Sequence, residues 1–335
     1  MSYLSIGDLA QALQQRQDNL RLRSDLARLS AELSTGRTAD PTAAVSGDFG
    51  ALGSIEASMA RLSAYSLAGR EAAMTAEGTQ AALEVVQTNM TELAGPLLLT
   101  LGGEAPSLVD ATAADARVRF SAVVAALNAR VADRSLFAGA ATDRLALADA
   151  EAMLDALMPA VAAETTAAGV EAVVRAWFDP GGDFDSAGYL GSAQPAAAVP
   201  LADGNAVDQP VTAADPVLRR TLAAFAMAAV LDRGALAGRP ADRADLATRA
   251  GEALLNAETG LVELRARTGT REEQIDQAMA RAQSGLAALE LARTEMLAAD
   301  PFETATRLKA AEAQLEALYT LTARLSRLSL TEYLR

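Results

Sequence analysis

Both ends of the chain carry leucines at the spacing of a helix that buries one side. From Leu22 the steps to the next leucines are four, three and four residues, ending at Leu33. Near the other end the same spacing runs through positions 308, 311, 315, 318, 321, 325 and 328, with alanine at 311 and leucine elsewhere. Such stripes are typical of coiled coils. They predict two long terminal helices that pair and leave further apolar residues for neighbouring subunits.

Two local signals mark where these terminal helices should end and begin. Gly36 follows the first stripe and is a favourable C-cap, because glycine readily takes the left-handed conformation that ends many helices. Asp300 precedes Pro301, which suits the start of a new helix, since aspartate caps well and proline fits the first turn. A last helix beginning at this pair is therefore expected.

Three more helices are expected between the terminal ones, over about 55–93, 111–134 and 242–298. Gly95-Pro96 should end the first, and residues 97–106 should connect it to the second. The apolar face of the second is expected to hold Val118, Val123, Leu127 and Val131.

The third of these helices contains Gly269, followed by Thr270 and Glu273, which could form a capping box and mark a helix start. The flanking pattern stays helical, so one continuous helix is favoured over a break at this glycine. Residues 37–50 are expected to form a loop with extended parts. Gly47, Gly50 and Gly53 do not follow a strand as a phosphate-binding loop would, and are interpreted as part of a flexible loop.

The middle of the chain has a different composition. Seven of the eleven prolines lie between 159 and 240, and residues 177–191 concentrate aromatics and glycines. This pattern predicts an inserted module with turns and short strands, flanked by helices near 145–175 and 214–234. The fold class is therefore mainly α, with long paired terminal helices, a helical-bundle core and a small α+β outer domain. The expected divisions are 1–36, 37–142, 143–240, 241–299 and 300–335.

Composition weakens several classes of function. The chain has no Cys and no His, which removes thiolate nucleophiles, most zinc sites and the best proton-transfer side chain near neutral pH. Its net charge of −14 and its interleaved basic residues do not suit nucleic-acid binding. No apolar run long enough to cross a membrane and no cleavable secretory signal is seen, so export, if any, would use another route. We expect no catalytic residues and no cofactor.

Two groups of side chains in the middle allow a sharper interpretation. Asp179, Asp183 and Asp185 could bind calcium, but their spacing does not match an EF-hand, and a solvated turn is favoured. The neighbouring aromatics could line a ligand pocket, but the core of a small domain is favoured, because aromatics carry much buried area. They are Trp177, Phe178, Phe184 and Tyr189.

Several segments together resemble the bacterial flagellin superfamily. Leu-Ser-Thr-Gly-Arg at 33–37, after a helix with Gln14, Gln15 and Gln17, resembles its N-terminal signature. Arg134 to Asp143 (Arg-Ser-Leu-Phe-Ala-Gly-Ala-Ala-Thr-Asp) resembles the branch of flagellar hook-associated protein 3, the hook–filament junction protein. The flagellin-type C-terminus is resembled by Gly269 with Arg271, Ala299-Asp300, Leu315 to Tyr319, Leu328 to Leu330, and Tyr333-Leu334. The resemblance covers about 1–142 and 242–335.

The resemblance implies a structural subunit between the hook and the filament. Its partners would be the first hook-associated protein, flagellin, lateral copies of itself and an export chaperone. It would leave the cell through the flagellar type III channel, uncleaved, with terminal segments poorly ordered. Residues 37–50 are poor in the asparagines and arginines usual in flagellin, which counts against the filament subunit itself. The alternatives are a divergent flagellin and a cytoplasmic coiled-coil scaffold.

The expected assembly interface consists of the leucines of both stripes. Those off the seam between the two terminal helices, such as Leu20 and Leu321, need neighbours in other copies. Ordering and assembly would then be coupled. The full set is Leu13, Leu20, Leu26, Leu29, Leu33, Leu308, Leu315, Leu318, Leu321, Leu325 and Leu328.

Overall fold

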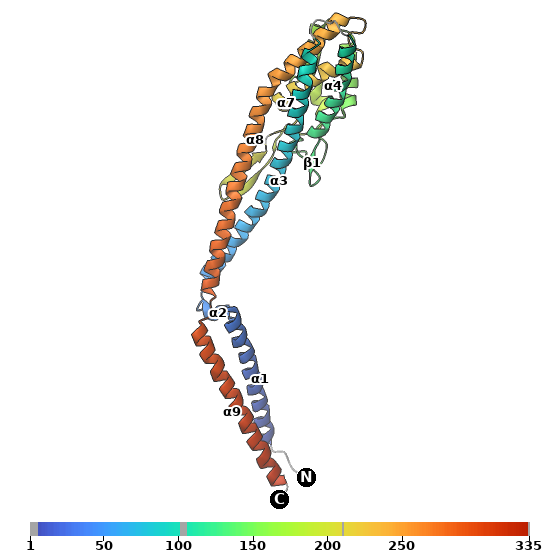
Figure 1. The fold of residues 1–335 in the computed structure, drawn as a ribbon. Coiled ribbons are helices and arrows are strands. Elements are labelled where there is room, and N and C mark those ends of the chain that lie inside the picture. The colour runs from blue at the N-terminus through green and yellow to red at the C-terminus, as the bar shows by residue number, and fades with distance from the viewer. Residues whose placement is uncertain (1–5, 101–105, 210, 334–335) are drawn as a thin grey trace. The chain divides into compact units, whose positions relative to one another are not determined.

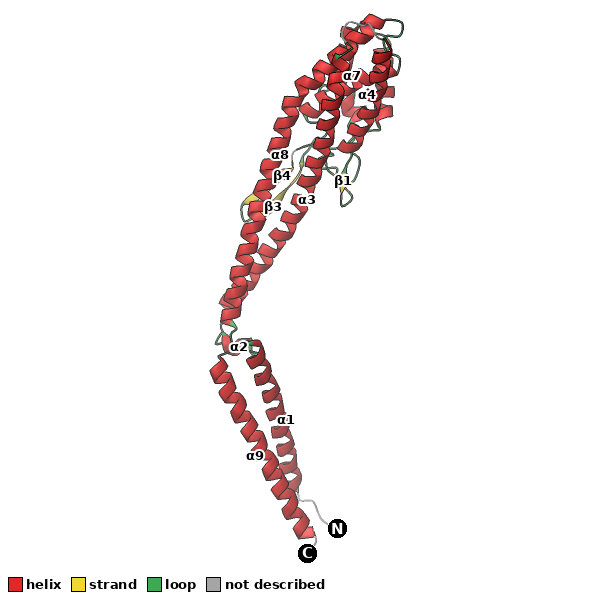
Figure 2. Cartoon of the chain, in the orientation of Figure 1, coloured by secondary structure: helices red, strands yellow, loops and turns green. Residues whose placement is uncertain are grey.

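A computed structural model describes residues 6–100, 106–209 and 211–333 of the chain (Figure 1). In that part the protein is mainly helical, as the composition predicted, with two small antiparallel hairpins (Figure 2). In chain order the elements are α1 (Ile6–Thr35), α2 (Pro41–Ala44), α3 (Gly50–Leu98), α4 (Pro106–Leu127), β1 (Arg130–Val131), β2 (Arg134–Ser135), α5 (Ala150–Val161), α6 (Ala167–Phe178), the π-helix η1 (Phe184–Gly188), β3 (Ala196–Ala202), β4 (Asn205–Gln209), α7 (Pro216–Asp232), α8 (Pro240–Met296) and α9 (Pro301–Tyr333).

The chain divides into two compact units. One contains residues 1–62 with 284–335, and the other contains residues 63–283. The five divisions expected from the sequence follow motifs and composition, and they stay a prediction. Residues 143–240 nevertheless share one hydrophobic core with parts of α3, α4 and α8.

Helix α7 is the centre of the larger unit. Every residue from Thr221 to Leu231 is buried, and α7 packs against α4, α5 and α6. Five of these eleven residues are alanines, whose small side chains let neighbouring helices approach closely. Asp215 caps the helix through its side chain, which accepts a hydrogen bond from the Val217 N–H.

Helices α3 and α8 lie side by side through the larger unit (Figure 1). The Gln80 side chain donates a hydrogen bond of 2.9 Å to the Arg265 carbonyl across the pair. Helix α8 runs unbroken through Gly269, which confirms the continuous helix. The β3–β4 hairpin packs Leu201 and Val207 against this pair.

Several details of the expected helices and of the expected loop over 37–50 were wrong. Helix α3 continues through Gly95-Pro96 to Leu98, because the fully buried Leu97 outweighs the one donor that proline lacks. It also begins earlier than expected, at Gly50, whose N–H donates to the Asp48 side chain at 2.9 Å. Gly50 and Gly53 are thus helical, and the short helix α2 interrupts the expected loop over 37–50. The connection expected over 97–106 lies partly outside the described residues.

The helix expected over 111–134 runs instead from Pro106 to Leu127 and is followed by the β1–β2 hairpin. Ala132 and Asp133 have φ of 47° and 62°, which suits a tight hairpin turn. Val131 is therefore in a strand. Val118 is 68% exposed rather than on the buried face, whereas Val123 and Leu127 are buried as expected.

The aromatic residues of the middle segment pack into the core of the larger unit, which confirms the favoured interpretation. Trp177 lies edge-on to Phe178 with 4.7 Å between ring centres, and Phe184 and Tyr189 extend the cluster. Asp185, one of the three aspartates considered for calcium, is paired with Arg219 and accepts the Gly181 N–H at 2.8 Å. Both interactions, with Arg219 first, lower the pKa of the Asp185 carboxyl.

Candidate assembly surface

Helices α1 and α9 form an antiparallel pair within the smaller unit (Figure 1). Leu29 on α1 is 4% exposed, and Thr304 and Ala311 on α9 are buried. Five of the predicted interface leucines are covered in this unit. Leu29 is buried, and the half-buried ones are Leu26, Leu308, Leu315 and Leu318. The predicted pairing of the terminal helices is thus present within one chain.

The other described leucines of the predicted interface are exposed. Leu20 is 66% exposed and Leu321 is 57% exposed, and Leu13 and Leu33 are exposed too. The side chains of Leu325 and Leu328 lie outside the described residues. One chain therefore covers only one side of the α1–α9 pair, and the role of the uncovered leucines in assembly stays a prediction.

Two exposed aromatic side chains belong to the same unit as these leucines, and the leucine pattern did not reveal them. Phe302, in the first turn of α9, is 84% exposed, and Phe49, just before α3, is also exposed. Phe302 follows the Asp300 cap, whose side chain accepts the N–H groups of Phe302 and Glu303 at 2.8 and 3.0 Å. These bonds confirm the helix start that Asp300-Pro301 predicted.

A polar contact joins α1 to α9 near their middles. The Arg23 guanidinium donates to the Tyr319 hydroxyl at 2.7 Å from one terminal nitrogen and at 3.3 Å from Nε. This bond lowers the pKa of the Tyr319 phenol, and Asn19 adds to the effect. No sequence pattern could have revealed the pair, since the two residues are 296 positions apart.

The segments that follow α1 and precede α9 bind each other through their main chains. The Ala299 N–H donates to the Gly36 carbonyl, and the Thr38 N–H donates to the Leu297 carbonyl, both at 2.9 Å. Gly36 has φ of +68° and its N–H donates to the Glu32 carbonyl, as expected of a C-cap. The segment after α1 and the segment before α9, here called the link, are therefore hydrogen-bonded to each other, in addition to the contacts between the two helices.

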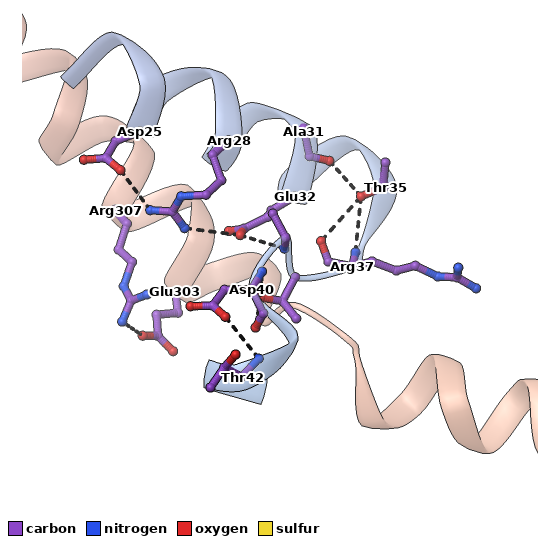
Figure 3. Close-up of polar contacts among 12 residues, drawn as sticks. Asp25, Arg28, Ala31, Glu32, Thr35, Arg37, Asp40, Thr42, Glu303 and Arg307 are labelled. Atoms are coloured by element: carbon purple, nitrogen blue, oxygen red, sulfur yellow. Dashed lines mark hydrogen bonds and ion pairs between the residues drawn. The ribbon is translucent and has the colours of Figure 1, made fainter. Parts of the chain in front are cut away.

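Glu32 fixes the turn that follows α1 (Figure 3). Its residue exposure is 6%, and its carboxylate accepts the Ala39 N–H at 2.9 Å and the Arg28 guanidinium at 3.2 Å. Arg28 also donates to Asp25 at 3.1 Å. The Asp25 bond, followed by the contribution of Glu32, raises the pKa of Arg28 against the opposing effect of burial. A buried carboxylate with two donors rigidifies the link.

The described residues offer little for other classes of site. Among them, no group of three or more acidic side chains is arranged to hold a metal ion. No helix in the described ranges is both long and apolar enough to cross a membrane. The uncovered helix pair is the most prominent candidate surface.

Residues 252–334 match the family described as the bacterial flagellin C-terminal helical region. The matched segment contains most of α8 and all of α9, including the predicted interface positions from Leu308 to Leu328. The chain thus carries a flagellin-type C-terminal region, which supports a structural role in the flagellum.

A solved structure described as a flagellar hook-associated protein from Vibrio parahaemolyticus is 13% identical to the chain. The alignment covers 72% of this chain and 94% of that one, with a TM-score of 0.49. No curated protein matches the sequence.

Proposed function

We propose that this chain is a structural subunit of the bacterial flagellum that joins the hook to the filament. The observation that carries the proposal is the α1–α9 pair, which belongs in part to a flagellin-type region and leaves leucines uncovered on its outer side. Fully burying one leucine contributes about 1.5–3 kcal/mol, so several per subunit give a cooperative contact between copies.

The partners follow from this role. The first hook-associated protein would contact one side of a ring of copies, flagellin the other, and lateral copies would cover Leu20 and Leu321. An export chaperone would protect the apolar helices before assembly. The protein would reach the cell exterior through the flagellar export channel. The choice of the junction branch rests on the resemblance of residues 134–143.

That segment also has a structural purpose in the larger unit. Phe137 and Ala138 are fully buried, and Gly139 has φ of +60°. The Ser192 N–H donates to the Ala138 carbonyl at 2.8 Å, and the Ala140 N–H donates to the Gln194 carbonyl at 2.9 Å. The segment thereby fastens the loop around 192–194 to the core.

The test is assembly on isolated hooks that carry the first hook-associated protein. The full chain should bind the hook ends and allow flagellin to polymerise from them, and it should form no long filaments alone, because its two faces suit different partners. A chain lacking 316–335 should keep the folded larger unit and lose hook binding. Long filaments from the purified chain would instead favour the divergent flagellin.

The alternative, that the chain is a cytoplasmic coiled-coil scaffold, predicts a different result. A scaffold should form a stable dimer through its stripes, and that dimer should survive deletion of 316–335. The pairing of α1 with α9 inside one chain counts against a stripe reserved for a second scaffold chain. Sedimentation of the full and shortened chains separates the two.

A further inference from the structure

A cavity lies in the larger unit, far along the chain from the terminal helices. It has a volume of about 380 Å³ and lies between the end of α6, most of α7 and the early part of α8 around residues 253–257. Pockets of roughly 300–1,000 Å³ commonly hold small ligands or short peptide segments. Neither the leucine stripes nor the flagellar role accounts for it.

Small and flexible apolar side chains make the floor of this cavity. Ala223 and Met227 come from α7, Ala257 from α8 and Phe178 from α6, and all four are buried. Ala253 on α8 is partly buried beside them. Alanines leave the hollow, and methionine can adapt to an inserted apolar side chain.

A preorganised guanidinium lines one wall. Arg219 is 8% exposed, donates to the Ala214 carbonyl at 2.9 Å and to the Phe178 carbonyl at 3.1 Å, and pairs with Asp185. It also lies over the Phe184 ring, 4.8 Å from its centre. Because these contacts fix the group in place, little conformational entropy is lost when a remaining N–H meets an acceptor.

Two more arginines stand at the rim. Arg220 is exposed, and its Nε donates only within its own helix, to the Pro216 carbonyl at 3.1 Å. Arg175 pairs with Glu171 at 2.6 Å, but Glu171 is shared with Arg249 at 2.9 Å, which leaves the Arg175 charge incompletely balanced. Asp179 is the one carboxylate in the lining, so the lining carries three positive groups against one negative.

We propose that this cavity binds a segment of a partner protein in which an apolar side chain is flanked by carboxylates. The apolar side chain would fill the space above Ala223, Met227 and Ala257. The carboxylates would accept hydrogen bonds from Arg220 and Arg175 at the rim and from the spare N–H of Arg219. Charge complementarity with the exposed Arg220 and the incompletely balanced Arg175 favours an acidic segment over a neutral one.

The test uses labelled peptides and the unaltered full chain in its monomeric fraction. Acetyl-Gly-Glu-Leu-Glu-Gly-amide should bind about tenfold more tightly than its Gln-Leu-Gln counterpart and than its Glu-Gly-Glu counterpart, in fluorescence anisotropy. Raising the salt from about 50 mM to about 500 mM should weaken only the acidic peptides. Equal affinity for the three peptides, or no binding by any of them, would overturn the proposal.

Substitutions in the lining test whether the peptide binds in this cavity. Ala253→Phe should fill the cavity and weaken the Glu-Leu-Glu peptide at least tenfold, while Arg220→Gln should weaken it about threefold, since that arginine is exposed. Arg144→Gln is the matched control, because Arg144 is an exposed arginine of the same unit outside the lining and should leave affinity unchanged. Circular dichroism checks folding. Unchanged binding to folded Ala253→Phe would place the peptide elsewhere and refute the assignment, and the peptide series on the unaltered chain decides the matter if a variant fails to fold.

Discussion

In the segment 134–143, neighbouring backbone carbonyls leave no room for a side chain at Gly139. A Cβ there would lie 2.5 Å from the Gln194 carbonyl oxygen and 2.7 Å from that of Ser192, and φ is +60°. Gly139→Ala should therefore lower the free energy of unfolding of the larger unit by about 2 kcal/mol or more. Urea unfolding followed by the fluorescence of Trp177, the only tryptophan, measures the loss.

Gly204→Ala is the matched control for that substitution. Gly204 has φ of +73°, but a Cβ would meet nothing within 4 Å. In this variant the free energy of unfolding should fall only by the cost of holding alanine in the left-handed conformation, about 1 kcal/mol. Equal losses at both positions would show that the carbonyl contacts at Gly139 do not matter.

Glu151 makes the larger unit sensitive to acid. Its carboxylate accepts two hydrogen bonds of 2.8 Å from Arg117 and one of 2.8 Å from Arg233. The Arg117 bonds, reinforced by Arg233, lower the pKa of Glu151 below its ordinary value of 4.5, although partial burial opposes them. A carboxylate with a lowered pKa stabilises the fold above its ordinary pKa and loses that contribution as the pH falls through the folded value.

The expected result is a difference in pH dependence between the natural chain and Glu151→Gln. From about pH 5 to about pH 3, the free energy of unfolding should fall more steeply for the natural chain, because only it has this carboxylate to protonate. Glu164→Gln serves as the control, and its profile should follow the natural one. Parallel profiles for all three proteins would contradict the prediction.

At the scale of elements, the start of α9 was predictable and the β1–β2 hairpin was not. Asp300-Pro301 carries a cap and a first-turn proline next to each other, and both act locally. The hairpin turn uses Ala132 and Asp133 at positive φ, where sequence patterns lead one to expect glycine or asparagine. Local chemistry thus located the end of α1 and the start of α9, whereas tertiary packing decided where α4 ended.

The candidate surface shows the same division. Spacing alone indicated that the terminal leucines share faces, and the structure covers Leu29 while leaving Leu20 open. The leucine spacing could not indicate the Arg23–Tyr319 hydrogen bond or the exposed Phe302, because neither follows from a periodic pattern. The cavity beside Arg219 was also beyond reach, since three helices distant in sequence create it.

The two faces of α1 allow pairing and assembly to be separated by substitution. Leu20→Ala should leave the helix content of the free chain unchanged, because Leu20 contacts little within it, and should weaken binding to hook ends. Leu29→Ala should destabilise the α1–α9 pair itself by about 2–4 kcal/mol wherever that pair is formed. Circular dichroism and hook-end occupancy by electron microscopy measure the two effects. Normal occupancy with Leu20→Ala would contradict a role for the uncovered face.

At the scale of the whole molecule, the two units differ in how they are stabilised. The larger unit has an extensive core around α7, in which most side chains are fully buried. Few of the described residues of the α1–α9 pair are buried, and on α1 the buried apolar residue is Leu29. Helices gain most of their stability from burying an apolar face, so the pair should be marginal in a single chain and firm in an assembly.

Hydrogen exchange tests this difference directly. In the free chain, amides of α7 and of the parts of α3 and α8 within the larger unit should exchange slowly, and those of 6–35 and 302–333 should exchange close to the rate of an unfolded chain. On hook ends the terminal amides should become protected, because neighbouring copies would cover Leu20 and Leu321. The comparison needs no substitution, since α7 in the same sample is the internal control. Strong protection of α1 and α9 in the free chain would refute coupled ordering and assembly, and would leave the uncovered leucines without that role.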